Sequence, residues 1–269
     1  MSAFIHHLSF EFRTGIRNKN LLLLNYLFPF GFYLMMGFIM PSINPPFREN
    51  IIPAFVVFGI LSATLLGIPD PLVTARENGI FRSYKINGVP AISILLISAL
   101  TVILHLMILT AMITITAPFL FDAPLPNNWG GFFLVFFAFA LASSALSVLI
   151  GVVSASSRVT VLWSQVVFVP SMILGGLMVP LNLMPDVAQK IAQMIPATHA
   201  SNAFNGMAMG VTPDFSPWGS IIVLITGGFF AFGLSLFLFS WDRHNTNRRG
   251  HPLLALLALL PYVIGVFLL

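Results

Sequence analysis

Residues 74–90 carry the densest group of charged side chains in the chain and read TARENGIFRSYKINGVP. Arg76, Glu77, Arg82 and Lys85 are four of only twenty Asp, Glu, Lys and Arg residues among 269. Apolar segments long enough to cross a bilayer flank this run on both sides, so its charges must lie in water. Such a loop can form ion pairs and hydrogen bonds with another protein, which makes it the first candidate for a functional surface.

Two more ionisable residues lie inside or at the edge of apolar segments, where charge is costly. His105 is surrounded by the run ILHLMI, and we expect a neutral histidine hydrogen-bonded between helices; a proton relay is the alternative. Asp70 lies between two prolines near the inner end of an apolar segment. We expect Asp70 to cap or pair locally, for example with Arg76, and the alternative is a contact with substrate or an ion.

Sequence motifs of catalytic sites are missing from this chain. There is no G-x-x-x-x-G-K-[ST] run to cradle ATP phosphates, no H-E-x-x-H, no G-x-S-x-G, and no cysteine for thiolate catalysis, metal binding or disulfides. An intramembrane hydrolase built from His105 and buried serines would need a pairing that the sequence does not reveal. The chain is therefore expected not to be an enzyme, and energy for any transport must come from elsewhere.

The composition is that of a membrane protein. Apolar residues make up 58% of the chain and charged residues 7%, whereas soluble domains have about 45–50% and about 25%. The net charge of +4 comes from basic residues scattered between apolar runs, so no stripe exists that could follow nucleic-acid phosphates. The first twenty residues lack the apolar region and cleavage site of a signal peptide.

About 20 apolar residues span the hydrocarbon core of a bilayer, and six segments meet this requirement. They predict an all-α polytopic membrane protein with spans at roughly 21–40, 51–73, 91–118, 130–153, 159–178 and 218–241.

Lys and Arg residues divide unequally between the two sides of these spans. Ten lie on one side and two, Arg48 and Lys190, on the other. The positive-inside rule then places the N-terminus and the 74–90 loop in the cytoplasm. The ten comprise Arg13, Arg17, Lys19, Arg76, Arg82, Lys85, Arg158, Arg243, Arg248 and Arg249.

The start of the chain, 1–20, has the pattern of an interfacial amphipathic helix. At 100° per residue Phe4, Ile5, Leu8, Phe12 and Ile16 share one face, opposite two arginines.

The long outer stretch 179–217 contains two short amphipathic segments. Residues 185–195 predict a helix that begins with a proline, and Thr198 is expected to cap a second helix after Pro196. Neither is long enough to cross a bilayer, and both follow the glycine-rich run LGGL at 174–177. We therefore expect the segment 175–215 to dip into the outer leaflet, buried by protein.

Two runs resemble the type-2 ABC exporter permeases. R-E-N-G-x-x-R followed by G-x-P in 76–90 is similar to the first cytoplasmic loop of that family, and PSMILGGLMVPLNLMP at 170–185 with IPATHA at 195–200 is similar to its fifth-helix end and re-entrant segment. Together with the six-span plan the resemblance covers 21–245 and the amphipathic start.

The resemblance implies a coupling helix that docks on a separate ATPase subunit, with the ATPase-coupling residues Arg76, Glu77, Gly79, Arg82, Lys85 and Gly88. Gly79 and Gly88 are expected to permit the sharp entry and exit of this helix. It implies a permease dimer, expected to be a homodimer, with two ATPase copies that bind ATP and Mg; this chain itself would hold no cofactor. The family places the fifth span near the transport pathway, where Gln165, Met172, Gly175 and Gly176 are the candidates.

The expected function is export across the cell membrane. With 27 Phe against four Tyr and four Trp, the sequence favours an apolar or amphipathic cargo such as a drug, a lipid or a lipid-linked glycan. An ion- or proton-coupled secondary transporter is the alternative.

The run 252–269 departs from the family plan. Its eighteen residues, PLLALLALLPYVIGVFLL, carry no charge, and we expect a seventh crossing on the periphery of the bundle. A half-inserted hairpin or a helix packed along the sixth span is the alternative, because Pro261 would kink a helix at mid-depth.

Overall fold

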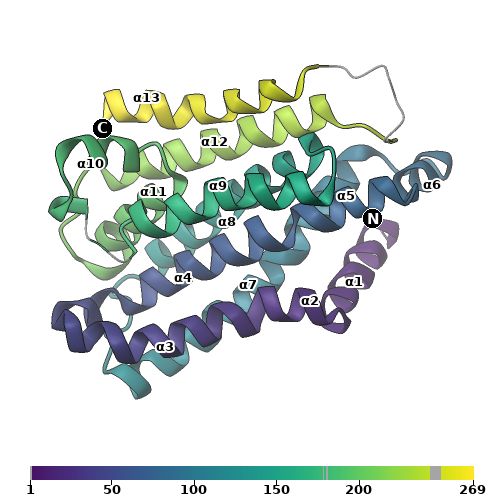
Figure 1. The fold of residues 1–269 in the computed structure, drawn as a ribbon. Helices are drawn as coiled ribbons and strands as arrows, with labels where there is room; N and C mark the ends of the chain where they lie inside the picture. The colour runs from purple at the N-terminus through teal and green to yellow at the C-terminus, as the bar shows by residue number, and fades with distance from the viewer. Residues whose placement is uncertain (1, 178, 180, 243–249) are drawn as a thin grey trace.

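The structure is a computed structural model that describes residues 2–177, 179, 181–242 and 250–269, and this part of the chain forms helices and no strands (Figure 1). The prediction of an all-α membrane fold is confirmed. The predicted basic tail residues Arg243, Arg248 and Arg249 lie outside the described residues.

Six helical segments in the described chain are long and apolar enough to cross a bilayer, as the sequence predicts. The first comprises α2 (Lys19–Leu22), η1 (Leu23–Leu27) and α3 (Phe28–Ile43), and the second comprises η2 (Pro45–Asn50), α4 (Ile51–Leu61), η3 (Ser62–Leu66) and α5 (Pro69–Glu77). The others are α7 (Ala91–Phe121), α8 (Trp129–Val153), α9 (Ser157–Leu174) and α12 (Pro217–Leu238).

The second span is the centre of the bundle. Its most apolar stretch is 94% buried, whereas the corresponding stretches of the first and fifth spans are 22% buried. The reason is its composition: all eleven residues of α4 are apolar or glycine and contact neighbours on every side. The first and fifth spans therefore lie at the edge of the bundle.

A stripe of small and hydroxyl side chains, Ser143, Ser147 and Gly151, allows α8 to approach its neighbours closely. The Oγ atoms of Ser143 and Thr64 lie 2.6 Å apart, which joins α8 to η3. A Cβ added at Gly151 would lie 3.1 Å from the carbonyl oxygen of Pro69, so α5 and α8 touch backbone to backbone. This stripe serves packing within one chain.

Two spans contain a π-helical turn, η1 and η3, and these turns pack against each other. Pro29 follows η1 and Pro69 follows η3 within a few residues. Proline cannot donate to the carbonyl four residues earlier and its ring crowds that carbonyl, so a wider turn accommodates it.

The short helices after α9 are α10 (Asp186–Ala192) and α11 (Pro196–Phe204), followed by the π-helical turn η5 (Asn205–Met209). Every residue of α11 is buried, and α11 packs against α8 and α12. The prediction that Thr198 caps this helix is wrong. The helix begins at Pro196, where a missing N–H costs nothing, and the Thr198 hydroxyl donates to the Ala192 carbonyl at 2.6 Å.

The fifth span also ends earlier than the predicted residue 178. Helix α9 ends at Leu174 because Gly175 caps it and Gly176 adopts a φ of 74°, a left-handed conformation that helices do not continue.

The last described segment consists of the 3₁₀ helix η6 (Pro252–Leu259) and α13 (Leu260–Leu268). It runs antiparallel to α12 along its whole length (Figure 1). Gly250 lies against Leu238 at one end of α12, and Leu269 lies against Gly219 at the other. A 3₁₀ helix rises about 2.0 Å per residue, so the segment is about 30 Å long, close to the thickness of the hydrocarbon core.

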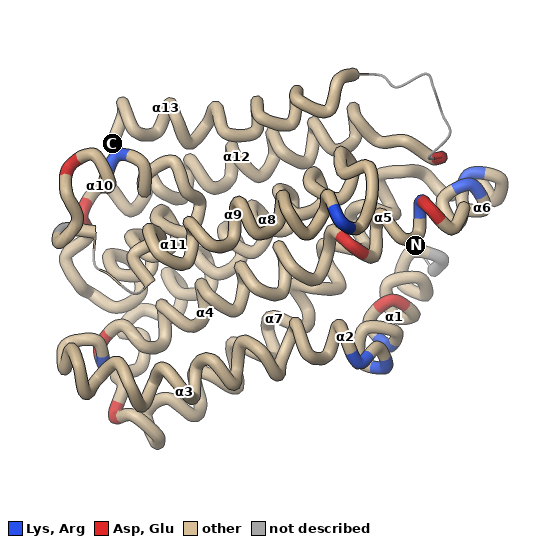
Figure 2. Tube along the Cα trace, viewed as in Figure 1, with Lys and Arg blue, Asp and Glu red and all other residues tan. Residues whose placement is uncertain are grey.

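Charged residues gather toward the two ends of the bundle, with uncharged helices between them (Figure 2). One end carries α1 (Ser2–Arg17) and α6 (Ile80–Ile86), and we call it the α6 end. The opposite end carries η2, α10 and α11, and we call it the α10 end.

Candidate functional site

The 74–90 loop folds as the end of α5, a tight turn and the short helix α6. Gly79 has a φ of 74° between the two helices, and Gly88 has a φ of 73° after α6. L-amino acids with a side chain rarely adopt these angles, so glycine is needed at both bends. The predicted role of these two glycines in shaping the loop therefore has a local physical basis.

Helix α6 has one face against the protein and one face in the open. Phe81 is buried, and its ring lies 5.4 Å from the ring of Phe239. Arg82 and Lys85 are exposed, and Ile86 exposes 79% of its surface. This face therefore leaves Arg82, Lys85 and Ile86 accessible to a partner.

Arg76 differs from the other charged residues of the loop. The sequence groups it with charges that lie in water, but its side chain is only 8% exposed. Its guanidinium donates to the carbonyl oxygen of Val152 at 2.7 Å and to that of Ser154. The prediction of an exposed Arg76 is wrong because the inward face of α5 meets the end of α8, whose last carbonyls need donors.

Arg82 fastens α6 to the end of the sixth span. Its guanidinium forms an ion pair with the carboxylate of Asp242, which follows α12. The Arg82 side chain is 64% exposed and that of Asp242 is 26% exposed, so the pair sits at the edge of the surface. Arg82 thus joins α6 to the segment after α12, while Arg76, which lies on α5, joins the second span to the end of α8. Glu77, which precedes the Gly79 bend, is exposed.

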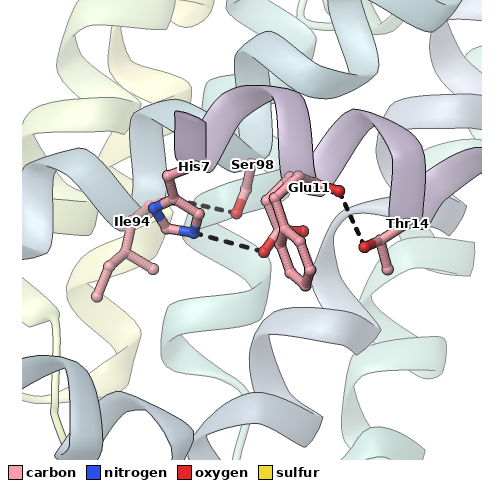
Figure 3. A network of polar contacts seen from close by, with 6 residues as sticks. His7, Glu11, Thr14, Ile94 and Ser98 are labelled. Carbon is pink, nitrogen blue, oxygen red and sulfur yellow. Dashed lines mark hydrogen bonds and ion pairs between the residues drawn. The ribbon is translucent and has the colours of Figure 1, made fainter. Parts of the chain in front are cut away.

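The N-terminal helix α1 packs against α7 and reaches α6. His7 Nε2 lies 3.5 Å from the Glu11 carboxylate within α1, beside the Ser98 hydroxyl that donates to the Ile94 carbonyl (Figure 3). The His7 ring also lies edge-on to Tyr84 of α6, with centroids 5.5 Å apart. Burial, and secondarily the Glu11 carboxylate, raise the pKa of Tyr84, which keeps its hydroxyl neutral.

Only part of the predicted apolar face of α1 contacts the protein. Leu8 and Phe12 pack toward α7, while Ile5 is 61% and Ile16 43% exposed. These two isoleucines continue the apolar face beside Arg13, which fits the predicted position at the surface of a membrane.

His105 lies where α1, α7 and the first span meet. Its Nδ1 is 2.7 Å from the Tyr26 hydroxyl, and the Phe12 ring stacks on it at 4.5 Å. The side chain is 1% exposed. This geometry is that of a histidine hydrogen-bonded between helices, the first of the two interpretations that the sequence allows. Asp70 lies in the first turn of α5, where the helix dipole stabilises a carboxylate. Among the described residues its side chain makes no capping hydrogen bond and no ion pair with Arg76, so the prediction of a local cap or pair is wrong.

A cavity of about 260 Å³ opens at the α10 end between η2, the end of α9 and the segment α11 to η5. Gly175 and Gly176, two of the predicted pathway residues, form part of its wall. A Cβ at Gly175 would lie 2.2 Å from the Ser171 carbonyl oxygen and 2.9 Å from Ala197 Cβ, so only glycine fits between α9 and α11.

Met172, the third predicted pathway residue, lines a neighbouring apolar cavity with phenylalanines of the first and second spans, among them Phe32, Phe55 and Phe58. That cavity measures about 10 Å³, which is hardly room for one water molecule. Gln165 is not brought to either cavity: its side chain is exposed on the outer face of α9.

Asn202 organises the wall of the larger cavity. Its Oδ1 accepts the N–H groups of Asp214 and Phe215, and its Nδ2 donates to the Phe215 carbonyl and the Ser220 hydroxyl. Sequence reasoning missed Asn202, because an asparagine in a short helix carries no pattern that predicts such a role. It also missed Glu49 and Asp214, because topology is read from Lys and Arg alone.

His199 is fully buried in α11, and its Nε2 lies 2.8 Å from the Gln193 carbonyl oxygen. Burial lowers its pKa to about 4, so it is neutral at physiological pH. Within the described part of the chain, no group of three or more His, Asp or Glu side chains is placed to hold a metal ion.

Residues 3–209 match the family described as ABC-2 type transporter. The chain is also 24% identical over 229 residues to the "Putative transport permease YvfS" of Bacillus subtilis (strain 168), a match that covers 80% of this chain and 88% of that protein. No solved structure matches the chain. With six apolar spans among its described residues, this multi-pass membrane protein therefore belongs to the ABC-2 type transporter family, as a transport permease that operates with an ATPase partner.

Proposed function

We propose that this chain is the membrane subunit of an ATP-driven exporter, in which two copies of the chain pair with two copies of an ATPase subunit. The α6 end faces the cytoplasm and α6 is the coupling helix. The α10 end faces outward, and cargo leaves on that side. ATP and Mg are bound by the partner ATPase, and the protein resides in the cell membrane.

This proposal rests on one observation: α6 has an exposed face, and side chains on its other face contact the rest of the protein. Lys85 and Ile86 face the open surface, where a partner could press on them. Arg82 links the same helix to Asp242 after α12, and Phe81 anchors it in the core. A push on α6 would reach the end of the sixth span through these contacts, and the second span through α5, which precedes α6 across the Gly79 bend.

The orientation rests on charge. The side that contains α6 holds ten of the chain's twelve Lys and Arg residues when counted along the sequence, and a cytoplasmic position for that side satisfies the positive-inside rule.

The exposed face of helix α9 is the basis for proposing a second copy of the chain. It is one of the two least buried spans, and it exposes Gln165, an amide, among exposed Leu162 and Val166. An amide that faces lipid would lack hydrogen-bond partners, whereas the same amide on a second copy could pair across the interface. The symmetric dimer is the commonest assembly of identical chains.

The cargo class rests on the abundance of phenylalanine, with 27 Phe against four Tyr and four Trp. Where phenylalanines of the first two spans meet Met172, they form an adaptable, polarisable wall without hydrogen-bonding groups, and the space of about 10 Å³ that they enclose is too small for cargo in this structure. Such a wall suits an apolar cargo or the apolar part of an amphipathic one.

The proposal is tested by co-expressing the chain with its ATPase and reconstituting the purified complex in sealed vesicles. Transport that requires ATP, stops with vanadate and persists when the proton gradient is collapsed is expected. Transport that needs only an ion or proton gradient would replace this proposal with a secondary transporter.

A further inference from the structure

We propose that the cavity at the α10 end binds a cationic group of the cargo, so that the exporter handles amphipathic molecules with a positively charged head. This inference rests on the proposed function for the direction of transport. The cavity wall contains two carboxylates, Glu49 and Asp214, and no lysine or arginine among its described residues. Arg48 precedes Glu49 in the chain, but its guanidinium forms an ion pair with Asp122 at 3.9 Å and not with Glu49.

Much of the polar wall is already committed to holding the fold. The hydroxyl of Ser201 donates to the Gly175 carbonyl at 2.8 Å, and that of Thr198 donates to Ala192. These bonds fix α11 against the end of α9, so the cavity is shaped in advance of any ligand.

The remaining polar groups are free to meet a ligand. Within the described residues, the side chains of Glu49, Asn50, Asn205 and Asp214 form no hydrogen bond or ion pair. Carboxylates and amide oxygens accept hydrogen bonds and attract cations. Both carboxylates are exposed at the mouth of the cavity. Partial desolvation raises the pKa of Asp214, and a bound cation would offset that desolvation.

The position of the cavity predicts an apolar tail on the same ligand. The polar and apolar cavities are adjacent, because consecutive residues of the chain line them. Pro46 and Gly176 line the polar cavity, and the residues that follow them, Phe47 and Leu177, line the apolar one. The polar cavity measures about 260 Å³ and the apolar one about 10 Å³. In this structure the polar cavity therefore has room for a cationic head, and the apolar side chains beside it are the surface that an attached apolar tail would meet.

The test uses a matched pair of small probes on the full-length permease in dodecyl maltoside. Choline carries a trimethylammonium group, and 3,3-dimethylbutan-1-ol has the same shape without charge. Saturation-transfer NMR titrations are expected to detect binding of choline and weaker binding of the neutral isostere. Glu49→Gln and Asp214→Asn should each weaken choline binding about fivefold, the size expected for one partly exposed charge pair. Asp186→Asn, which neutralises an acid of α10 outside the cavity, should leave it unchanged.

A second readout reports the charge of the cavity without a bound ligand. The chain has no cysteine, so Thr212→Cys places a single thiol in the cavity wall. A cationic methanethiosulfonate reagent should label it faster than a neutral one of similar size, and Glu49→Gln should reduce this preference. Equal binding of choline and its isostere, or equal binding by native protein and both variants, would overturn the site. Binding is measured without ATP, so an intact choline site in a protein that shows no ATP-driven transport would defeat only the proposed function.

Discussion

Replacing Arg76 with methionine tests whether this arginine stabilises the fold, in contrast to the exposed arginine of the same loop. Methionine keeps most of the aliphatic volume but removes the guanidinium, which donates to the carbonyls of Val152 and Ser154 at the end of α8. Each charge-assisted hydrogen bond contributes about 1.5–3 kcal/mol, and the buried carbonyls would lose their donor. We expect a loss of about 3–5 kcal/mol in the free energy of unfolding.

Arg82→Met is the matched control. Its ion pair with Asp242 joins two partly exposed side chains, and such pairs are worth up to about 1 kcal/mol. For a chain of this size 1 kcal/mol corresponds to about 2–4 °C in melting temperature. Arg76→Met should therefore melt about 10 °C below the native protein in detergent, and Arg82→Met within about 4 °C.

The assay is thermal unfolding of the purified permease, monitored by size-exclusion chromatography. Membrane insertion of each variant is checked separately. Equal melting temperatures for the two variants would refute the assignment of Arg76 as the cap of α8. Arg76→Lys is expected to recover only part of the loss, because an ammonium cannot match the planar fork that reaches two carbonyls.

Three further predictions follow from the structure. Gly175→Ala places a Cβ 2.2 Å from the Ser171 carbonyl oxygen and should lower yield and melting temperature. Gly176→Leu strains a backbone with a φ of 74° and should lower the melting temperature, but it should block export more than it lowers expression; equal loss of export and expression would make that site purely structural. A fusion after Leu269 should give active alkaline phosphatase and dark green fluorescent protein if 252–269 crosses the membrane, and the reverse pattern would return the chain to six spans. His199 has a pKa of about 4 in the folded protein and about 6.5 when unfolded, so the unfolded state binds the proton first and stability should fall as pH drops from about 6.5 to about 4. His199→Gln should flatten that slope in pH-dependent melting curves, and an unchanged slope would show that other groups cause it.

The spans could be predicted because a bilayer imposes one simple demand, about 20 apolar residues in helical form. Their order and type follow from hydropathy, and the glycines at 79 and 88 from the sharp turns that a short loop requires. The positions of helix ends were less secure. Pro196 rather than Thr198 begins α11, and α9 stops before Gly175 and Gly176, since tertiary packing selects among several local starts and stops.

The sequence predicted where the candidate site lies in the chain, but it did not predict which residues its side chains contact. Arg76 and Arg82 are close in sequence, yet one is buried against Val152 and the other pairs with Asp242, 160 residues away. Such contacts depend on how α5 and α12 pack, which a hydropathy pattern does not encode. Gln165 illustrates the same point: the sequence suggests a pathway residue, while the structure turns its side chain to the outer face of α9.

The central claim, that α6 transmits the action of an ATPase partner, is tested most directly by the transport and ATP hydrolysis of a Glu77→Lys complex. Glu77 is exposed beside the Gly79 bend, so reversing its charge should leave folding and insertion intact. Lys190→Glu on α10 reverses a charge at the opposite end and serves as the control. The account predicts that Glu77→Lys abolishes both transport and cargo-stimulated ATP hydrolysis while Lys190→Glu retains them; normal export by Glu77→Lys would contradict it.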